Sequence, residues 1–329
     1  YLIFCIVNTM ILSRHLDSFP FDLVARGSIA TIGSFDGLHL GHQQLLEKIL
    51  NASRESGLPS VVMSFEPTPK EFFLADKPPA RLMRFREKYE ALESAGIDIF
   101  FCPSFNDAMK NIAADAFIRR ILIHAMNIQN LIVGDDFRFA HDREGDCDIL
   151  REAGENLGFR VQQMSSVVEG GQRVSSSAIR EVLWKGDLEL ATILLGKEYR
   201  MSGKVIEGER IGRELGYPTA NVNLKRKQSA VMGIFAVRVA GENWGPLDAV
   251  ASVGTRPTFG PNKPILEVHI FDFDKDIYGE YIHVDFISRL RNEEKFDDVD
   301  GLVEQMHQDS ALAKKVLAVQ SGVLDRGTD

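Results

Sequence analysis

Apolar and polar positions follow two different patterns along the chain, and the first pattern begins at about residue 28. There, short apolar runs alternate with segments whose apolar residues recur at helical spacing. The predicted strands are residues 28–33, 60–65, 97–102, 130–134 and 160–164. The predicted helices are residues 42–53, 84–96, 114–127 and 148–158. Such alternation predicts an α/β fold, a doubly wound parallel sheet with helices on both faces.

A second pattern of apolar and polar positions begins after about residue 198. The apolar segments become short, rich in β-branched and aromatic residues, and separated by Gly, Pro or Asn turns. The predicted strands are residues 202–208, 233–241, 247–254, 265–273 and 281–288, and the next long helical pattern is 298–318. We therefore expect a small all-β, antiparallel barrel with a terminal helix. Residues 181–199 look helical and are expected to connect the two parts.

The two patterns predict two domains, at residues 10–197 and 198–329. The chain length of 329 residues agrees, because it exceeds what a single hydrophobic core usually organises. Residues 1–9 are expected to be an extension outside the fold, because Met10 opens a plausible chain. The apolar start is shorter than the ~20 residues that a membrane span needs.

Charge and cysteine content narrow the classes of partner. With 38 Lys and Arg against 47 Asp and Glu, the net charge is −9, which opposes nucleic-acid binding because phosphate neutralisation needs a basic surface. The three cysteines are scattered, as in reduced cytoplasmic proteins. We expect small-molecule substrates, with neither nucleic acid nor membrane as a partner; homo-oligomerisation stays open.

The stretch "GSFDGLHLGH" follows the first predicted strand and carries two histidines. Gly37 allows a sharp turn, and a helix beginning near Gly41 would point its free N–H groups at that turn. His39 and His42 can then aim imidazole N–H groups at one anion, which favours stabilisation of phosphate charge. One alternative is half of a metal site, although no third ligand stands at a recognisable spacing. The other is that both histidines are incidental loop residues.

The stretch "VSSSAIR" is the expected counterpart of the two histidines. Hydroxyl groups followed by Arg180 at the start of a helix can bind a departing pyrophosphate, because the guanidinium offers a fork of donors. The alternative is that Ser175 or Ser176 only caps the helix.

Together with "VGDDFRFAHDREGD" and residues 65–92, these motifs resemble the FMN adenylyltransferase half of the bifunctional riboflavin kinase/FMN adenylyltransferase family (prokaryotic FAD synthetase). The resemblance implies attack by the FMN phosphate on the α-phosphorus of ATP, which gives FAD and pyrophosphate. His39 and His42 would steady the α- and β-phosphates, and Arg180 the leaving group. The implied nucleotide- and flavin-binding residues are Gly33, Ser34, Phe35, Asp36, Gly41, Ser175, Ser176, Ser177, Asp136, Phe137 and Arg138, of which the last three border the flavin.

Three residues depart from the family pattern. Ser34 stands where the family often has Asn, and Ser177 replaces a usual Thr but keeps the hydroxyl. Ala140 replaces a usual Gly, so the backbone of the turn after Arg138 is an open question.

A glycine-rich stretch, "SGKVIEGERIGRELGYPTANV", opens the second domain. Glycine-rich loops before a strand can cradle phosphate through backbone N–H groups, and Gly203, Gly208 and Gly212 lie in this one. Thr219 and Asn221 alternate onto one face as oxygen donors for Mg²⁺. The alternative is a purely structural loop and strand start.

Strand alternation in "ILEVHIFDF" puts Glu267 on one face with His269 and Phe271, while Leu266 and Val268 point the other way. A carboxylate in an otherwise apolar strand is either a salt-bridged rim residue or a general base, and an alcohol must lose a proton to attack a γ-phosphate.

The order of "GKVIEGERIGRELGYPTANV", "GIFAVRV", "ASVGTRPTFG" and "LEVHIFDFDKDIYGEYIHVDFISRLRNEEKF" resembles the riboflavin kinase half of the same family. It implies ATP-dependent phosphorylation of the ribityl 5′-hydroxyl, with Thr219 and Asn221 holding Mg-ATP and Glu267 as the base. Nucleotide- and flavin-binding roles are implied for Gly203, Lys204, Gly208, Gly212 and Arg291. Ser252 replaces a frequent Asn.

We therefore expect riboflavin to become FMN in residues 198–329 and FMN to become FAD in residues 10–197, with ATP and Mg²⁺ at both sites. One alternative is another adenylyl- or cytidylyltransferase with a non-catalytic barrel, which Glu267 beside "PTAN" opposes. Another is a non-catalytic flavin- or RNA-binding module, which the net charge and the two histidines oppose.

Overall fold

The computed structural model describes residues 9–208, 212, 215–255 and 264–324. Its contacts divide the chain into two compact units, one holding the residues up to Pro79 and Met83–Val174, the other Ala80–Leu82 and the residues from Ser175 onward. The predicted extension at residues 1–9 lies outside the described residues except for Thr9, which is exposed. Among the described residues, none of the helices is both long and apolar enough to cross a membrane.

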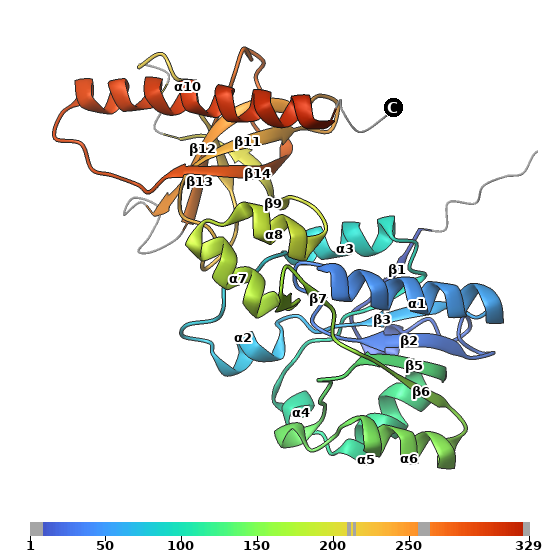
Figure 1. Ribbon diagram of the computed structural model, residues 1–329. Helices are drawn as coiled ribbons and strands as arrows, with labels where there is room; N and C mark the ends of the chain where they lie inside the picture. The colour runs from blue at the N-terminus through green and yellow to red at the C-terminus, as the bar shows by residue number, and fades with distance from the viewer. Residues whose placement is uncertain (1–8, 209–211, 213–214, 256–263, 325–329) are drawn as a thin grey trace, which may run out of the picture. The chain divides into compact units, whose positions relative to one another are not determined.

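The first unit contains a six-stranded parallel sheet in the order β1-β4-β3-β2-β5-β6 (Figure 1). Its strands are β1 (Ile11–Ser13), β2 (Ser28–Ile32), β3 (Ser60–Met63), β4 (Ile99–Phe101), β5 (Ile128–Gly134) and β6 (Arg160–Met164). The five predicted strands are confirmed. The edge strand β1 was missed, because a strand of three residues is too short to produce a readable alternation.

Helices cover both faces of this sheet, as a doubly wound fold requires. They are α1 (Leu40–Ser56), α2 (Pro69–Phe73), α3 (Phe85–Ser94), α4 (Asp107–Lys110), α5 (Ala114–Phe117), the π-helical η2 (Ile118–Ala125) and α6 (Cys147–Leu157), with short 3-10 turns η1 (Leu16–Ser18) and η3 (His141–Arg143). In β3, Val62 packs with Ile49 of α1 on one face. Its neighbour Val61 packs with Ile121 of η2 on the other. Because successive side chains of a strand point to opposite faces, each strand contributes to two separate hydrophobic cores.

The second unit begins with α7 (Ser176–Lys185) and α8 (Leu188–Leu195), where a single helical segment was predicted. The helix breaks because Gly186 adopts a φ of 82° and Asp187 caps the next helix by accepting the N–H of Leu190. Because α8 contacts strands of the barrel, the compact units separate at Ser175 rather than at the predicted domain boundary of 197 and 198. That boundary stays a prediction about function.

The rest of the second unit is a closed antiparallel barrel in the order β10-β13-β12-β11-β14-β9. Its strands are β9 (Tyr199–Ile206), β10 (Ala220–Asn223), β11 (Gly233–Ala240), β12 (Leu247–Thr255), β13 (Pro264–Ile270) and β14 (Tyr281–Arg291), followed by α10 (Val299–Leu324). The terminal helix lies along the outside of the barrel (Figure 1), where Ala313 and Leu317 pack against Ala236 and Ile287. The predicted barrel with a terminal helix is confirmed.

Candidate active sites

The loop between β2 and α1 lies at the carboxyl end of the parallel sheet, where ligands of such sheets gather. Phe35, Gly37 and Leu38 all have positive φ, of 48°, 92° and 43°. Ordinary side chains in this region cost about 1–3 kcal/mol each, and such strain persists only where surrounding contacts hold it. Several contacts hold this loop: for example, Met83 donates its N–H to Asp36 Oδ1 at 2.8 Å, and Gln43 donates its side-chain amide to the Leu38 carbonyl at 2.8 Å.

The predicted adenosine contacts divide into buried and exposed groups. Asp36 and Phe35 are buried, and the ring of Phe35 lies so close to Gly33 that a Cβ there would be 3.1 Å from it. Ser34 is exposed. Asp36 therefore has a positioning role in the loop, and the adenosine contacts stay a prediction.

His39 and His42 come together at the first turn of α1, as predicted. Their rings stack with centroids 3.7 Å apart and planes 16° apart. His39 also caps the helix, because its Nδ1 accepts the backbone N–H of His42 at 3.4 Å. That bond implies that neutral His39 carries its proton on Nε2, which makes Nε2–H its ring donor. Gly41 lies beneath, where a Cβ would be 3.4 Å from the His39 ring.

His42 is held neutral near pH 7. Burial lowers its pKa well below 6.5, and the charges of His39 and Lys88 lower it further. Its Nδ1 is enclosed and has no hydrogen-bond partner among the described residues, so a proton there would be unsatisfied. No group of three or more potential His, Cys, Asp or Glu metal ligands occurs in the described part of the chain.

Sequence reasoning missed Lys88, which lies on the sheet-facing side of α3 and is only 3% exposed. Its ammonium donates to the Ser34 carbonyl at 2.5 Å and to Ser64 Oγ at 3.3 Å. The predicted helix 84–96 contained this lysine, but nothing in the pattern marked it as buried.

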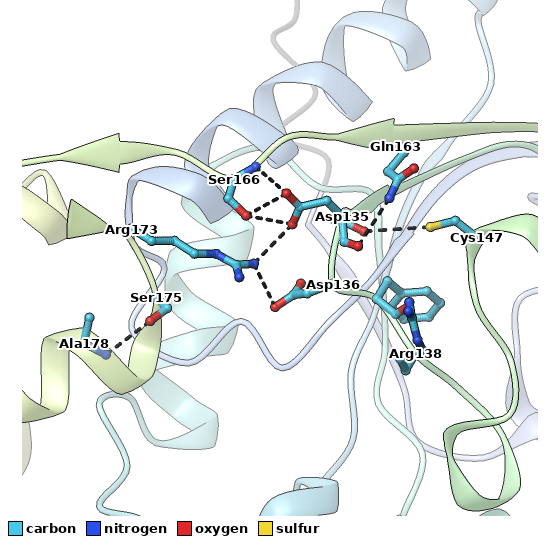
Figure 2. Close-up of polar contacts among 11 residues, drawn as sticks. Asp135, Asp136, Arg138, Cys147, Gln163, Ser166, Arg173, Ser175 and Ala178 are labelled. Atoms are coloured by element: carbon cyan, nitrogen blue, oxygen red, sulfur yellow. Dashed lines mark hydrogen bonds and ion pairs between the residues drawn. The ribbon is translucent and has the colours of Figure 1, made fainter. Parts of the chain in front are cut away.

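The loop after β5 carries the predicted flavin residues Asp136, Phe137 and Arg138 next to an ionic network (Figure 2). Asp135 accepts the Ser166 hydroxyl at 2.7 Å, which is the main reason that its pKa is lowered. Arg173 lies 3.1 Å from both Asp135 and Asp136. It belongs to a small hairpin of β7 (Val168–Glu169) and β8 (Gln172–Arg173).

Ala140 resolves the question raised by its departure from the family pattern. Its backbone lies at φ 66° and ψ −173°, a region populated almost only by glycine. The turn therefore keeps the shape that glycine favours and stores strain in doing so. Arg138 is exposed, while Phe137 stacks on Phe139 with centroids 5.8 Å apart.

Four aromatic rings cluster beyond the carboxyl ends of β3 and β4, and sequence reasoning did not single them out. Phe65, Phe72 and Phe73 each lie within 5.8 Å of Phe105, centroid to centroid. Phe73 is 59% exposed although it belongs to this cluster. A flat apolar ligand could stack there at low cost.

The predicted pyrophosphate residues lie at the start of α7 in the second unit. Ser175 caps the helix by accepting the N–H of Ala178 at 3.2 Å, and its predicted pyrophosphate contact stays a prediction. Ser177 is exposed and Ser176 partly buried. Arg180 donates its Nε to the Ala80 carbonyl at 2.6 Å, which orients the guanidinium.

On the barrel, three predicted or noted residues fall in one row across neighbouring strands. Glu267 of β13 is directly opposite Asn221 of β10 and Ser252 of β12. Directly opposed side chains point to the same face with Cβ atoms about 4.5–5.5 Å apart. Leu266 and Val268 are fully buried, so the predicted alternation of this strand is confirmed and Glu267 lies on the outer face of the barrel.

Two described glycines of the glycine-rich stretch, Gly208 and Gly212, lie close to the predicted metal donors. A Cβ at Gly208 would lie 2.2 Å from Asn221 Nδ2, and one at Gly212 would lie 3.2 Å from Thr219 Oγ1. Asn221 and Thr219, the predicted metal donors, are thus each close to one of these glycines. Gly203 is needed for another reason, since a Cβ there would lie 2.6 Å from the Asn223 carbonyl of the paired strand. Lys204 is exposed.

Arg291 lies at the end of β14 and forms an ion pair with Asp309 of α10. Its Nη2 is 2.7 Å and its Nε 2.9 Å from the carboxylate oxygens, and Gln305 donates to the same carboxylate at 3.0 Å. The hydrogen bond to Asp309 raises the pKa of Arg291. The contact ties the terminal helix to the barrel, and the predicted flavin contact of Arg291 stays a prediction.

Comparison with known proteins places both halves of the chain in one family. The family model described as FAD synthetase matches residues 22–178, and the one described as riboflavin kinase matches residues 195–317. A bifunctional riboflavin kinase/FMN adenylyltransferase of Escherichia coli (strain K12) is 43% identical over 88% of this chain and 92% of its own length. The protein of the same description from Haemophilus influenzae is 41% identical over 88% of this chain and 94% of its own length.

A solved structure has a similar fold over nearly the whole chain. A crystal structure described as a macrolide-efflux protein from Streptococcus pneumoniae matches with a TM-score of 0.77 and 30% identity, covering 93% of this chain and 99% of that one. The two family models match in the order FAD synthetase, then riboflavin kinase, and the bifunctional relatives are matched over more than 90% of their own length. The chain therefore belongs to the bifunctional riboflavin kinase/FMN adenylyltransferase family.

Proposed function

We propose that this chain makes FAD from riboflavin in two ATP-dependent steps, with the residues described above in separate roles. The observation that carries the proposal is that one chain holds two constellations suited to triphosphate chemistry. One is the stacked His39 and His42 at the start of α1, and the other is Glu267 in a row with Asn221, against which Gly208 packs.

In the first step the 5′-hydroxyl of riboflavin attacks the γ-phosphorus of ATP at the barrel. Glu267 accepts the hydroxyl proton as the new O–P bond forms and the bond to ADP breaks. The adjacent Asn221 and Thr219 offer neutral oxygens, the ligand type that Mg²⁺ takes alongside phosphate. Bound with ATP, Mg²⁺ would neutralise phosphate charge. Ser252 stands on the opposite flank of Glu267 and offers a hydroxyl to orient the carboxylate.

In the second step a phosphate oxygen of FMN attacks the α-phosphorus of a second ATP, and pyrophosphate leaves. His39 donates from Nε2–H, and the free N–H groups at the start of α1 add the positive end of the helix dipole. His42, neutral because of its lowered pKa, donates without carrying a charge of its own. The strained loop holds these donors in place before the substrate arrives, which is the main source of electrostatic catalysis.

The remaining predicted residues have supporting roles in this proposal. Ser176, Ser177 and Arg180 bind the pyrophosphate, whereas Ser175 acts as the cap of their helix. Asp136, Phe137 and Arg138 border the flavin, and the exposed ring of Phe73 gives its apolar face a place to stack. In this proposal residues 10–197 carry adenylyl transfer and residues 198–329 carry phosphorylation.

The test is a time course of purified protein with riboflavin and Mg-ATP, with riboflavin, FMN and FAD separated by chromatography. We expect FMN to rise first and FAD with pyrophosphate to follow, and chelation of Mg²⁺ to stop both steps. Supplied FMN should be converted without the first step. Failure to form FMN, or failure to convert supplied FMN, would overturn the corresponding half of the proposal.

A further inference from the structure

The only lysine of α3, Lys88, has its ammonium beneath the loop that carries the two histidines. Its Nζ donates to the carbonyl of Ser34, the residue at the start of that loop, at 2.5 Å. It also donates to Ser64 Oγ at 3.3 Å, and Ser64 Oγ in turn donates to the same Ser34 carbonyl at 3.3 Å. Lys88 therefore links the segments that follow β2 and β3 at the carboxyl edge of the sheet.

Burying an ammonium is costly, so this position does more than fill space. Lys88 is 3% exposed, and an apolar side chain of similar length would pack there without the loss of hydration. The loop above it has strained backbone at Phe35 and Leu38, which needs bonds to hold it. A charged donor makes a stronger bond to a carbonyl than a neutral one.

The charge of Lys88 also acts on the histidine pair. Within the described part of the chain, the charged groups that face His42 and lower its pKa are His39, in the preceding turn, and Lys88 of α3; the carboxylate of Asp36 in the same loop bonds to Met83 N–H. Both facing groups disfavour a proton on His42, in addition to its burial. Since a nearby positive charge lowers the pKa of an imidazole, removal of the ammonium should raise it.

We infer that Lys88 is a positioning residue for the adenylyl step: by bonding Ser34 and Ser64 it fixes the phosphate-binding loop that carries His39 and His42. The inference rests on the proposed adenylyl transfer. Lys88 does not touch the reacting atoms; it acts through the loop and through His42.

The test compares Lys88→Met with Lys88→Arg and with Lys48→Met, a control that removes an exposed lysine from α1. In the full chain, Lys88→Met should lower kcat for FMN to FAD by about 100-fold, the usual effect of a loop displaced by about 1 Å. Phosphorylation of riboflavin by the same preparation should stay unchanged, and thermal unfolding reports whether the unit that holds Lys88 is folded. Lys48→Met should leave both steps unchanged.

The pH dependence separates positioning from a merely structural role. In Lys88→Met the NMR titration of His42 should move up toward 6.5, and the acid limb of the adenylyl pH–rate profile should move to higher pH with it. Lys88→Arg keeps the charge and should keep the wild-type profile even if its rate falls. The inference is overturned if Lys88→Met retains the wild-type rate, or if both steps fall together with an unchanged profile. It is also overturned if His42 of the wild-type protein titrates at 6.5 or above. Absence of adenylyl transfer in the wild type would instead sink the proposed function.

Discussion

The contact between Gly208 and Asn221 allows a quantitative prediction for the kinase step. In Gly208→Ala, the new Cβ would lie 2.2 Å from Asn221 Nδ2 and 2.6 Å from its Cγ, whereas ordinary contacts begin at 3.4 Å. The amide of Asn221 must therefore move by more than 1 Å. Because Asn221 is directly opposite Glu267, this displaces the proposed metal and nucleotide donor beside the proposed base.

A displacement of about 1 Å in a reacting constellation typically costs about 100-fold in rate, or ~2.7 kcal/mol in activation free energy. The stability should change less, by about 1 kcal/mol, since a side chain rather than the backbone gives way. We expect kcat for riboflavin to FMN to fall about 100-fold in Gly208→Ala, with conversion of supplied FMN to FAD unchanged. Steady-state assays of both steps with one preparation, and thermal unfolding, measure these quantities.

A double-mutant cycle shows whether the effect passes through Asn221. In an Asn221→Ala background there is no amide to displace, so Gly208→Ala should add less than about threefold to the loss. A Gly208→Ala enzyme with wild-type kinase activity would refute the reasoning, as would an equal loss from Gly208→Ala in both backgrounds.

Four further outcomes follow from the described contacts. Asp309→Ala should lower the free energy of unfolding by about 2–3 kcal/mol in urea titrations, because it leaves the guanidinium of Arg291, whose side chain is only 19% exposed, without its carboxylate partner. An unchanged free energy of unfolding would show that this ion pair does not stabilise the protein. Ala140→Gly should raise that free energy by about 1 kcal/mol, since glycine relieves the strain of a φ of 66°, and a lower melting temperature would contradict it. The pKa of His42 is lower in the folded protein than its value near 6.5 in the unfolded chain, so on acidification the unfolded chain takes up this proton first. The contribution of neutral, buried His42 to the free energy of unfolding is therefore fully present above pH 6.5 and falls as the pH drops toward the folded pKa. A His42→Gln protein should lack that part of the acid slope in unfolding experiments. Titration with a non-hydrolysable ATP analogue should find two molecules bound per chain. A stoichiometry of one would contradict one of the two proposed ATP sites.

Much of this architecture is present in the sequence because it depends on local patterns. The alternation of strands and helices predicted the doubly wound sheet, and short strands between turns predicted the barrel. The pair His39 and His42 could be placed at a helix start, because glycines and a following amphipathic segment fix that turn. The face of Glu267 followed from the period of a strand.

What the sequence did not reveal depends on contacts between distant segments. Lys88 is a surface residue by composition, and only the folding of α3 against the sheet puts it beneath Ser34. The close packing of Gly208 on Asn221 brings together two residues that are thirteen positions apart in the chain. The break at Gly186 was readable only in part, because glycine is tolerated inside helices and the stop depends on the cap at Asp187.

Division of labour between two independent sites is tested most directly by mixing two variants. With riboflavin and Mg-ATP, folded His42→Ala protein should accumulate FMN and make no FAD. Folded Glu267→Gln protein should leave riboflavin unchanged but convert supplied FMN. An equimolar mixture should make FAD from riboflavin, because FMN released by one protein is the substrate of the other. A mixture that yields no FAD, or a single folded variant that has lost both steps, would contradict two separate sites.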